Sequence, residues 1–253
     1  MSAARGALLV CALVAAPASA ASGWSLSADL EHFRWRESGS PSVTESGPRY
    51  GLSWSYAWER PVGWQWAYRG EFRRGSVDYN GALLFSDEPA TARTRYTGVV
   101  NEAQGIYRFA DPAGVELVAG LGWDYWQRKI LPDQPEDYSV VFLRLGVTID
   151  PRTNTGWFGG AGLKRPLYIS ENAHLDEIGF DQNPRLEPKG DFSLYLQAGY
   201  RFTPNVSLIG YYESYRFRES ADVRVTSEGS TFFLFQPASN LDTFGLKLRY
   251  SFQ

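Results

Sequence analysis

The sequence predicts an all-β fold: a single transmembrane antiparallel up-and-down β-barrel of about ten strands. Three observations support this prediction. Segments of about ten residues alternate apolar and polar side chains, the polar connections between them alternate short and long, and aromatic residues make up 15% of the chain. The last segment, Gly245 to Gln253, shows the alternation clearly. Its polar face carries Lys247 and Arg249, and its apolar face comprises Leu246, Leu248, Tyr250 and Phe252.

The first twenty residues, MSAARGALLVCALVAAPASA, have the features of a secretory signal peptide. A positive charge at Arg5 precedes an apolar run from Ala7 to Ala16, and Ala18-Ser19-Ala20 has the small residues that signal peptidase accepts. The run is shorter than the ~20 residues of a membrane-spanning helix. We therefore expect a signal peptide over residues 1–20 and a barrel over residues 21–253.

Composition excludes several other classes. The only cysteine, Cys11, lies inside the predicted signal peptide, so the mature chain has no disulfide. A formal net charge of −3 gives no reason to expect a nucleic-acid partner. The mean hydropathy of −0.33 would suggest a water-soluble protein, but barrel strands are only half apolar and average out as polar.

Period-2 alternation predicts the strands in order along the chain. The clear segments are 49–59, 64–74, 115–125, 139–149, 191–202 and the C-terminal one. Segments that alternate less cleanly are 24–35, 96–109, 157–163 and 206–215. Together they make about ten strands, the even number that bacterial barrels have.

The connections fall into two classes. The short ones combine Pro with Gly, Asp or Asn, which form tight turns, and span 59–63, 110–114, 150–156 and 203–205. The long polar ones span 38–48, 75–93, 165–190 and 219–240, and 130–137 is of modest length. Short turns at one end and long loops at the other are typical of membrane barrels, and an even strand count places both termini at the short-turn end.

A water-soluble β-sandwich or lipocalin-like barrel is the alternative fold. It would not sort its aromatic residues to the ends of the strands. Here the apolar faces carry aromatics near both ends, with mostly aliphatic residues between, which predicts two interfacial girdles. The predicted girdle residues are Trp24, Trp58, Trp64, Trp123, Tyr125, Trp157, Tyr200 and Phe252.

The predicted signal peptide, the alternating strands and the aromatic-rich last strand resemble the Gram-negative outer-membrane β-barrels. The resemblance covers nearly all of the mature chain as a pattern. It implies a monomer in the outer membrane with both termini in the periplasm, surrounded by lipid and lipopolysaccharide. It also implies recognition of the C-terminal strand by the barrel-assembly machinery. Family members usually end on an aromatic residue, whereas here Gln253 follows Phe252.

The polar faces predict a lumen filled by bulky charged side chains of both signs. Residues symmetric about a turn should face each other, as Arg108 and Glu116 do about Pro112, and Asp29 should meet Lys247 or Arg249 where the barrel closes. We interpret the set as a salt-bridged filling, with a narrow polar conduit or ligand pocket as the alternative. The predicted lumen residues are Asp29, Glu31, Arg69, Glu71, Arg73, Glu102, Gln104, Arg108, Glu116, Asp124, Arg144, Lys164, Arg201, Glu213, Lys247 and Arg249.

The sequence shows no clear catalytic centre. Omptin-type proteases and lipid A-modifying enzymes of the outer membrane need a histidine acting with a carboxylate or serine. His32 has the parity of the lipid face, and His174 lies in a long loop as His-Leu-Asp, without the Asp-x-His order and the second Asp pair of the omptin pattern. Two histidines and no mature cysteine offer little for a zinc site, and we expect no cofactor and no metal.

Two loop stretches are apolar where solvent is expected, and we consider them as contact candidates for lipopolysaccharide or a partner protein. Residues 223–226 and 231–235 could form a hairpin beyond the last strands. The sequence thus predicts a structural or narrow porin-like barrel that is not an enzyme. The alternatives are a surface adhesin or ligand-binding barrel and an omptin- or deacylase-like hydrolase. The loop contact candidates are Leu83, Leu84, Phe85, Phe232, Phe233 and Phe235.

Overall fold

The computed structural model describes residues 21–39, 42–82, 88–130 and 134–252. The predicted signal peptide and the apolar stretch Leu83-Leu84-Phe85 lie outside the described residues. Among the described residues, no helix is long and apolar enough to cross a membrane.

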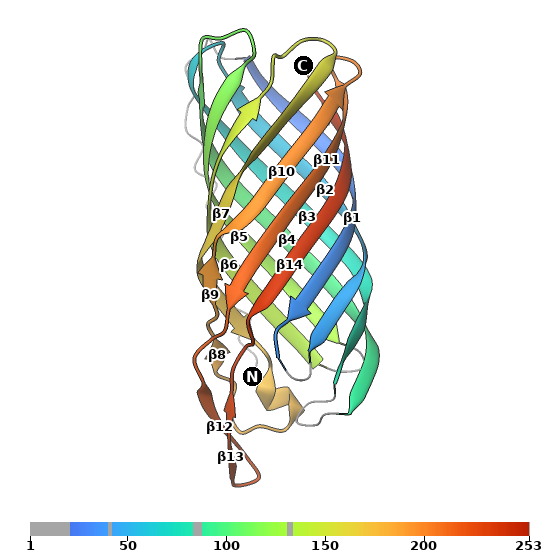
Figure 1. The fold of residues 1–253 in the computed structure, drawn as a ribbon, viewed down its shortest axis with the longest axis vertical. Coiled ribbons are helices and arrows are strands. Elements are labelled where there is room, and N and C mark those ends of the chain that lie inside the picture. The colour runs from blue at the N-terminus through green and yellow to red at the C-terminus, as the bar shows by residue number, and fades with distance from the viewer. Residues whose placement is uncertain (1–20, 40–41, 83–87, 131–133, 253) are drawn as a thin grey trace, which may run out of the picture.

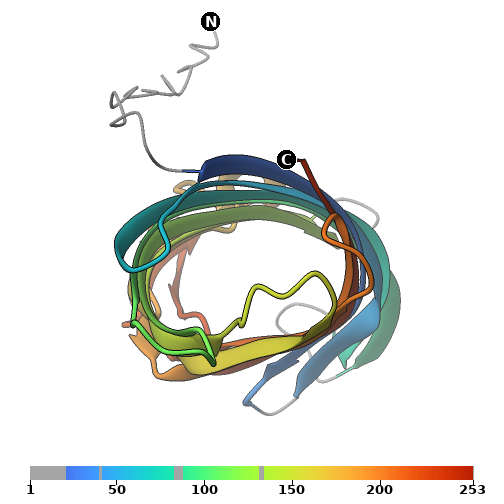
Figure 2. The same ribbon diagram turned by 90° about the horizontal axis from the view of Figure 1, so that it is seen from above.

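Ten antiparallel strands close into one barrel, which confirms the predicted fold class (Figures 1 and 2). Neighbours along the chain pair with each other from β1 to β7, β14 pairs with both β1 and β11, and β10 closes the ring by pairing with β7 and β11. The ten strands are β1 Ala21–Glu37, β2 Val43–Glu59, β3 Gly63–Ala82, β4 Pro89–Arg108, β5 Val115–Ile130, β6 Gln134–Ile149, β7 Gly156–Asn172, β10 Ser193–Arg201, β11 Val206–Arg218 and β14 Ser239–Ser251.

The short-turn end is formed by the four predicted turns and by the terminal strands. Gly114 has a φ of 69°, and its carbonyl accepts a hydrogen bond of 3.0 Å from the backbone N–H of Asp150 in the neighbouring turn. A Cβ on Gly114 would overlap the Asp150 carbonyl oxygen, so this close approach requires glycine. Ser25 of β1 pairs with Ser251 of β14, so the first and last strands of the barrel are neighbours at this end.

At the other end several short elements fold beyond the barrel (Figure 1). They are the 3₁₀ helix η1 Leu175–Ile178 and the strands β8 Arg185–Leu186, β9 Lys189–Asp191, β12 Val223–Ser227 and β13 Ser230–Leu234. β12 and β13 pair as the predicted hairpin. Positive φ values of 50° at Glu228 and 79° at Gly229 form its two-residue turn, the geometry that matches the twist of a hairpin.

The predicted long connections were wrong in large part, because the strands continue through them. β3 runs on to Ala82 and β4 begins at Pro89, so most of the predicted 75–93 loop is paired strand. With a tilted rise of about 2.5 Å per residue along the axis, a strand as long as β3 spans about 50 Å, twice the ~25 Å apolar band of a membrane barrel. The longest strands therefore continue well beyond the membrane.

The short-turn half of the barrel, which we call the belt, has an apolar outer surface. Outward side chains of this half are mostly aliphatic or aromatic, as a bilayer requires. Asn101 of β4 is a polar exception, and its side-chain oxygen accepts a hydrogen bond from the hydroxyl of Tyr68 on the neighbouring strand. The exposed outward residues of the belt include Trp24, Leu26, Leu30, Tyr50, Leu52, Trp64, Trp66, Phe72, Leu117, Leu121, Leu143, Leu145, Val147, Ile149, Trp157, Leu163, Leu194, Leu196, Leu208, Leu246, Leu248 and Tyr250.

The other half, which we call the extension, has the opposite polarity. Its outward residues are mostly polar, as Arg34, Arg74, Asp78 and Arg95 show, although Leu167 of β7 is also exposed. Its interior is a continuous apolar core in which Trp126 stacks on Tyr138 at 5.0 Å between ring centroids. The buried core residues are Phe33, Trp35, Val77, Tyr96, Val100, Trp126, Tyr138, Val140, Phe142, Ile169, Tyr215, Phe217 and Leu241.

Candidate functional site in the barrel interior

The structure places every predicted lumen residue on the inward face of its strand, although burial varies. Ten are nearly inaccessible to solvent: Asp29, Glu31, Glu71, Glu102, Arg108, Glu116, Asp124, Arg144, Lys164 and Lys247. Six are half-buried: Arg69, Arg73, Gln104, Arg201, Glu213 and Arg249. The two-residue period of a strand brings these side chains inward, because the belt's apolar residues occupy the alternate positions.

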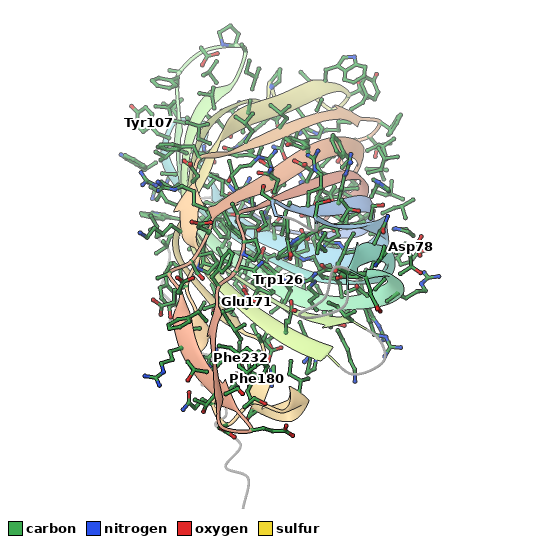
Figure 3. The ribbon with its side chains drawn as sticks, turned by 60° about the horizontal axis from the view of Figure 1, so that its bottom comes forward. Asp78, Tyr107, Trp126, Glu171, Phe180 and Phe232 are labelled. Atoms are coloured by element: carbon green, nitrogen blue, oxygen red, sulfur yellow. The ribbon has the colours of Figure 1, made fainter. Side chains whose placement is uncertain are left out.

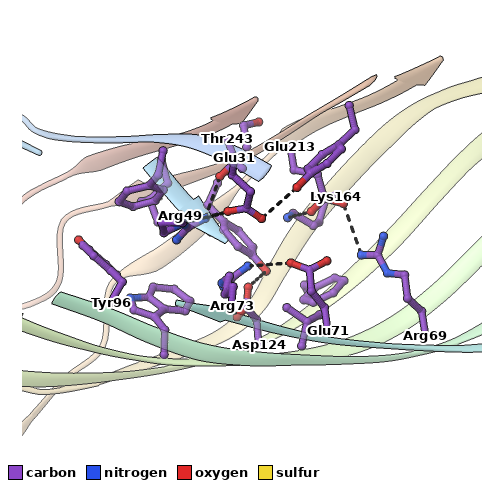
Figure 4. Close-up of a pocket in the computed structure, with 18 residues that line it drawn as sticks. Glu31, Arg49, Arg69, Glu71, Arg73, Tyr96, Asp124, Lys164, Glu213 and Thr243 are labelled. Atoms are coloured by element: carbon purple, nitrogen blue, oxygen red, sulfur yellow. Dashed lines mark hydrogen bonds and ion pairs between the residues drawn. The ribbon is translucent and has the colours of Figure 1, made fainter. Parts of the chain in front are cut away.

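Two carboxylates from different strands hold three cations at the centre of the belt. The Glu213 carboxylate on β11 accepts from Arg144 Nη2 at 2.8 Å, Lys164 Nζ at 3.1 Å and Arg69 Nη2 at 3.4 Å. Glu102 on β4 lies 3.0 Å from Arg144 Nε and 3.2 Å from Arg69 Nη2. Figure 4 shows Arg69, Lys164 and Glu213 meeting across the interior. The cluster therefore ties opposite walls of the barrel together.

A second group of ion pairs lies beside this centre (Figure 4). Arg49 donates to Glu31 Oε2 from Nη2 at 2.7 Å and from Nε at 3.0 Å. Lys247 Nζ lies 3.5 Å from Asp29 and 3.6 Å from Glu71. The contact between Asp29 and Lys247 confirms the pairing predicted at the closure of the barrel.

Further ion pairs line the short-turn end. Arg108 Nη1 donates to Glu116 Oε1 at 2.7 Å, and these residues pair across the turn as predicted. Arg201 Nη2 lies 2.8 Å from Asp150 Oδ2. Arg249 has no ion-pair partner among the described residues. The space beside it, near Ser25 and Ser55, opens to solvent.

The interior between these ion pairs is almost full. Two cavities border the central cluster, with volumes of about 30 and 50 Å³. A water needs roughly 10–15 Å³ of such volume, so each cavity has room for only a few waters. The aromatic core of the extension covers the cluster on its other side, with Tyr215 donating from its hydroxyl to Asp124 at 3.0 Å. Beyond an open space of about 590 Å³ at the short-turn mouth, the lumen is therefore filled in two layers, one ionic and one aromatic.

Sequence reasoning missed a second charged cluster, which lies inside the extension. Arg128 contacts Glu45 at 2.6 Å, Glu136 at 2.5 Å and Glu37 at 3.5 Å. Glu171 is fully buried beside them. The inward parity of these residues could have revealed the cluster, but the segments that carry most of them were interpreted as loops.

The carboxylates of this second cluster outnumber its cation, which affects their protonation. Burial raises the pKa of Glu171 well above its usual value, and the neighbouring charges of Glu136 and Glu37 raise it further. Burial also raises the pKa of Glu37, against the opposing effect of Arg128. Burial therefore makes Glu171 and Glu37 easier to protonate in the folded protein than in water.

His174 is neither in the lumen nor freely solvated. Its Nε2 lies 2.9 Å from Asp137 Oδ2, its Nδ1 lies 3.3 Å from Glu177 Oε1, and its backbone has a φ of 49° at the start of η1. Asp137 also accepts from the hydroxyl of Tyr125 at 3.0 Å. His32 is exposed on the outer face of β1, as its parity predicts. Within the described residues, no group of His, Cys, Asp or Glu is arranged to hold a metal ion.

The predicted aromatic and loop residues lie in three places. Trp123 and Tyr125 stack at 6.0 Å in the middle of β5, where the belt meets the extension, and the others lie nearer the two ends of the molecule. At the short-turn end, rings contact each other along neighbouring strands, as in the pairs Trp64–Tyr107 at 5.4 Å and Trp157–Tyr200 at 5.1 Å. Phe232 packs on Phe180 at 5.7 Å within a small apolar cluster, as Figure 3 shows. The packing leaves Phe232 half-buried, whereas Phe233 is 66% exposed and Phe235 46% exposed.

No family model matches the chain, and no curated protein matches it in sequence. Among solved structures, the outer membrane protease OmpT from Escherichia coli is similar with a TM-score of 0.53 and 12% identity, over 91% of this chain and 96% of that one. The β domain of the Bordetella autotransporter BrkA matches with a TM-score of 0.42, 14% identity and coverage of 92% and 100%. An outer membrane channel from Pseudomonas putida F1 matches with a TM-score of 0.40, 11% identity and coverage of 94% and 100%. The chain therefore has the fold of the outer-membrane β-barrels.

Proposed function

We propose that this protein is a closed structural barrel that crosses the bacterial outer membrane and carries a folded extension beyond it. The observation that supports this most directly is the two-layered filling of the lumen. The ionic cluster around Glu213 leaves cavities of only about 30 and 50 Å³, and the aromatic core lies over it. A conducting pore needs a continuous path lined by groups that a solute can leave again. The filled interior favours a structural role over the narrow porin-like one.

The orientation we propose puts the short turns and both termini in the periplasm and the extension outside the cell. Short periplasmic turns and longer external segments are the rule for such barrels. The aromatic contacts at the short-turn end, such as Trp64 on Tyr107, fit the membrane interface on the periplasmic side. We further propose that the barrel is a monomer and that the barrel-assembly machinery recognises its C-terminal strand.

Conductance in planar bilayers tests the closed lumen. We expect the wild-type barrel to give no single-channel steps. Parallel recordings from a conducting porin in the same bilayers show that the assay can detect an open barrel. Steps from the wild-type protein would contradict the closed barrel and favour the narrow porin-like role.

A second candidate function is surface binding through the extension. The exposed rings of Phe233 and Phe235 on and beside the hairpin support it, because such rings at an exposed tip commonly mark contact surfaces. Attachment of cells that display the barrel to host cells or matrix proteins would measure it. The variant Phe233→Ser/Phe235→Ser should lower attachment, whereas Phe232→Leu, which keeps the packed cluster apolar, should not. Equal attachment by all three proteins would remove the hairpin from consideration.

We also propose that the barrel is not a hydrolase and that His174 acts as a structural residue. Its contacts with Asp137 and Glu177 hold η1 against the barrel, and Asp137 is shared with Tyr125. The experiment compares peptide and lipid A hydrolysis by the wild-type protein and by His174→Ala. We expect no turnover from either protein. Turnover that His174→Ala abolishes would overturn this proposal and favour the hydrolase alternative.

A further inference from the structure

A large groove lies on the outer surface of the barrel, at the boundary between the belt and the extension. Its volume is about 710 Å³, within the range of roughly 300–1,000 Å³ that ligand sites occupy. The floor consists of aliphatic belt residues of β6 and β7, among them Leu143, Leu145 and Leu163. The basic residues Arg165, Lys189 and Arg218 also line it.

The groove exists because two strands separate there. The ladder between β7 and β10 ends at the pair Lys164–Ser193, and the next strand, β9, pairs with β11 and not with β7 (Figure 1). Pro166 has no N–H to extend the ladder, and the register between β6 and β7 shifts beside it. Gly190 of β9 lies against Pro166, so the two strands touch without the hydrogen bonds that join the other strands. We call this site the seam groove.

The cations of the seam groove are unusually available. Arg165 lies over the ring of Phe192 at 4.9 Å, and neither Arg165 nor Lys189 has a carboxylate partner among the described residues. Arg218 is 3.8 Å from Asp191, and both of these side chains are more than half exposed. Glu187 is the only acidic residue that lines the groove, so the lining carries an excess of two positive charges.

We propose that the seam groove binds a phosphorylated, acylated glycolipid of the lipid A type. Acyl chains would lie on the aliphatic floor at the level of the bilayer, and phosphate groups would meet Arg165, Lys189 and Arg218, where the apolar surface ends. Guanidinium and ammonium groups bind phosphate through charge-assisted hydrogen bonds. β7 and β9 leave strand edges unpaired at the groove, and their backbone groups need hydrogen-bond partners wherever they would otherwise face hydrocarbon. The polar part of the ligand would also reach these edges.

The occupant follows from the charge and from the place of the groove. A second copy of this chain in a symmetric contact would bring the same cations together, which disfavours dimerisation there. The choice of lipid A over a glycerophospholipid rests on the proposed orientation, because that orientation places the groove in the outer leaflet. The binding measurement itself uses the purified protein in detergent, so it does not depend on orientation or on conductance.

Native mass spectrometry with added diphosphoryl lipid A tests the proposal. We expect a one-to-one complex, and we expect Arg165→Gln/Lys189→Gln/Arg218→Gln to weaken it at least tenfold, because each basic residue near a lipid headgroup adds to the affinity. The matched control is Arg34→Gln/Arg74→Gln/Arg95→Gln. Those three arginines are also outward, exposed and without ion pairs among the described residues, but they lie on β1, β3 and β4. The control should bind within about twofold of wild type.

Each alternative result has a definite meaning. Equal losses in the two triple variants would show general attraction to the basic surface and would overturn the site. Equal binding of phosphatidylglycerol would overturn the choice of lipid A, and equal binding of dephosphorylated lipid A would overturn the role of the cations. Displacement of bound lipid A by a similar concentration of inorganic phosphate, which has no acyl chains, would overturn the role of the floor. Failure of the closed-lumen proposal would appear as conductance steps and would leave these results unchanged.

Discussion

The belt and the extension are largely built from the same strands, yet their polarity is opposite. In β3 the belt half sends Trp64 and Phe72 outward and Arg69 inward, whereas the extension half sends Asp78 outward and Val77 inward. The hydrogen-bonded ladder with β4 continues without interruption through this change. The backbone pairing is therefore the same in both halves. The type of side chain that faces outward differs because the two halves have different surroundings.

The comparison separates two ways of filling a barrel. In the belt the outer face must be apolar for lipid, so the interior takes the charged residues and neutralises them in pairs across the lumen. In the extension the outer face meets water, so the interior takes a core of ordinary protein type, as Trp35 and Trp126 illustrate. The belt depends on electrostatic pairing and the extension on apolar packing, and each kind of interaction can be broken separately.

The largest effect should come from Glu213→Ala in the belt. The substitution leaves Arg144, Lys164 and Arg69 without their shared carboxylate inside the barrel, with only Glu102 to balance them. Removing one partner of a buried ion pair costs about 3–5 kcal/mol. We expect a loss of this size in the free energy of unfolding, measured by denaturant titration of the barrel in phospholipid vesicles.

Two controls sharpen that experiment. Glu213→Gln keeps hydrogen-bond acceptors near the cations and should lose less stability than Glu213→Ala. Glu177→Ala removes a carboxylate that is 60% exposed in the extension and should change stability little. If Glu213→Ala and Glu177→Ala unfolded at the same denaturant concentration, ion pairing would not be what stabilises the interior of the belt.

The second prediction introduces the same charge on the outer face of each region. Leu246→Arg puts a charge on the lipid face of the belt, which costs about 2–4 kcal/mol near the middle of the bilayer. Asn80→Arg puts it on the outer face of the extension, next to water, where we expect a change within ~0.5 kcal/mol. Unfolding free energies of both variants in vesicles measure the difference. Equal losses would show that the two outer faces meet the same surroundings.

The polarity of the belt could be predicted from the sequence, and that of the extension could not. Alternation such as Leu246-Lys247-Leu248-Arg249 identifies a half-buried strand, and its repetition along the chain with aromatic residues near the strand ends favours a membrane barrel. Val77 and Tyr79 in β3 also alternate with polar residues, but these are Asp78 and Asn80, which are common in loops. Such a stretch is equally compatible with a loop. Only the pairing with β4 shows that it is a strand with its apolar side inward.

The ion pairs of the interior show the same limit. Arg108 and Glu116 could be paired from sequence because a short turn fixes which residues face each other. The partners of Glu213 come from β3, β6 and β7, and they meet it across the lumen rather than along a ladder. Contacts of this kind depend on the diameter and tilt of the closed barrel, which the pattern of one strand does not contain.

The third prediction concerns pH and the extension. The raised pKa of Glu171 and Glu37 means that the folded state holds protons that the unfolded state releases above about pH 4.5. The stability of the extension is then greatest at low pH and falls as pH rises through the raised folded-state values. Hydrogen exchange of the amides around Trp35 and Trp126, compared at about pH 5 and about pH 8 after correction for intrinsic exchange, should show weaker protection at the higher pH.

Glu171→Gln provides the control for the pH effect. The amide cannot ionise, so the variant should lose part of the pH dependence and keep more protection at about pH 8 than the wild type. The belt amides should respond less than those of the extension in both proteins, because this cluster lies outside the belt. A wild-type extension that becomes better protected as pH rises would contradict the assigned direction of the pKa shifts.

The smallest predicted effect compares the turns at the two ends. Gly229 has a φ of 79° in the hairpin of the extension, and a Cβ there would meet no neighbouring atom, so Gly229→Ala adds only the cost of the left-handed backbone, about 1 kcal/mol. Gly114→Ala adds a clash with the Asp150 carbonyl to a similar backbone cost and should destabilise the barrel more. Because the hairpin packs on the extension alone, Gly229→Ala should change hydrogen exchange around Val225 while leaving the denaturant midpoint of the belt in place. A shift of that midpoint by Gly229→Ala would mean that the two regions unfold as one unit, and the contrast between them would then be one of surface chemistry and not of stability.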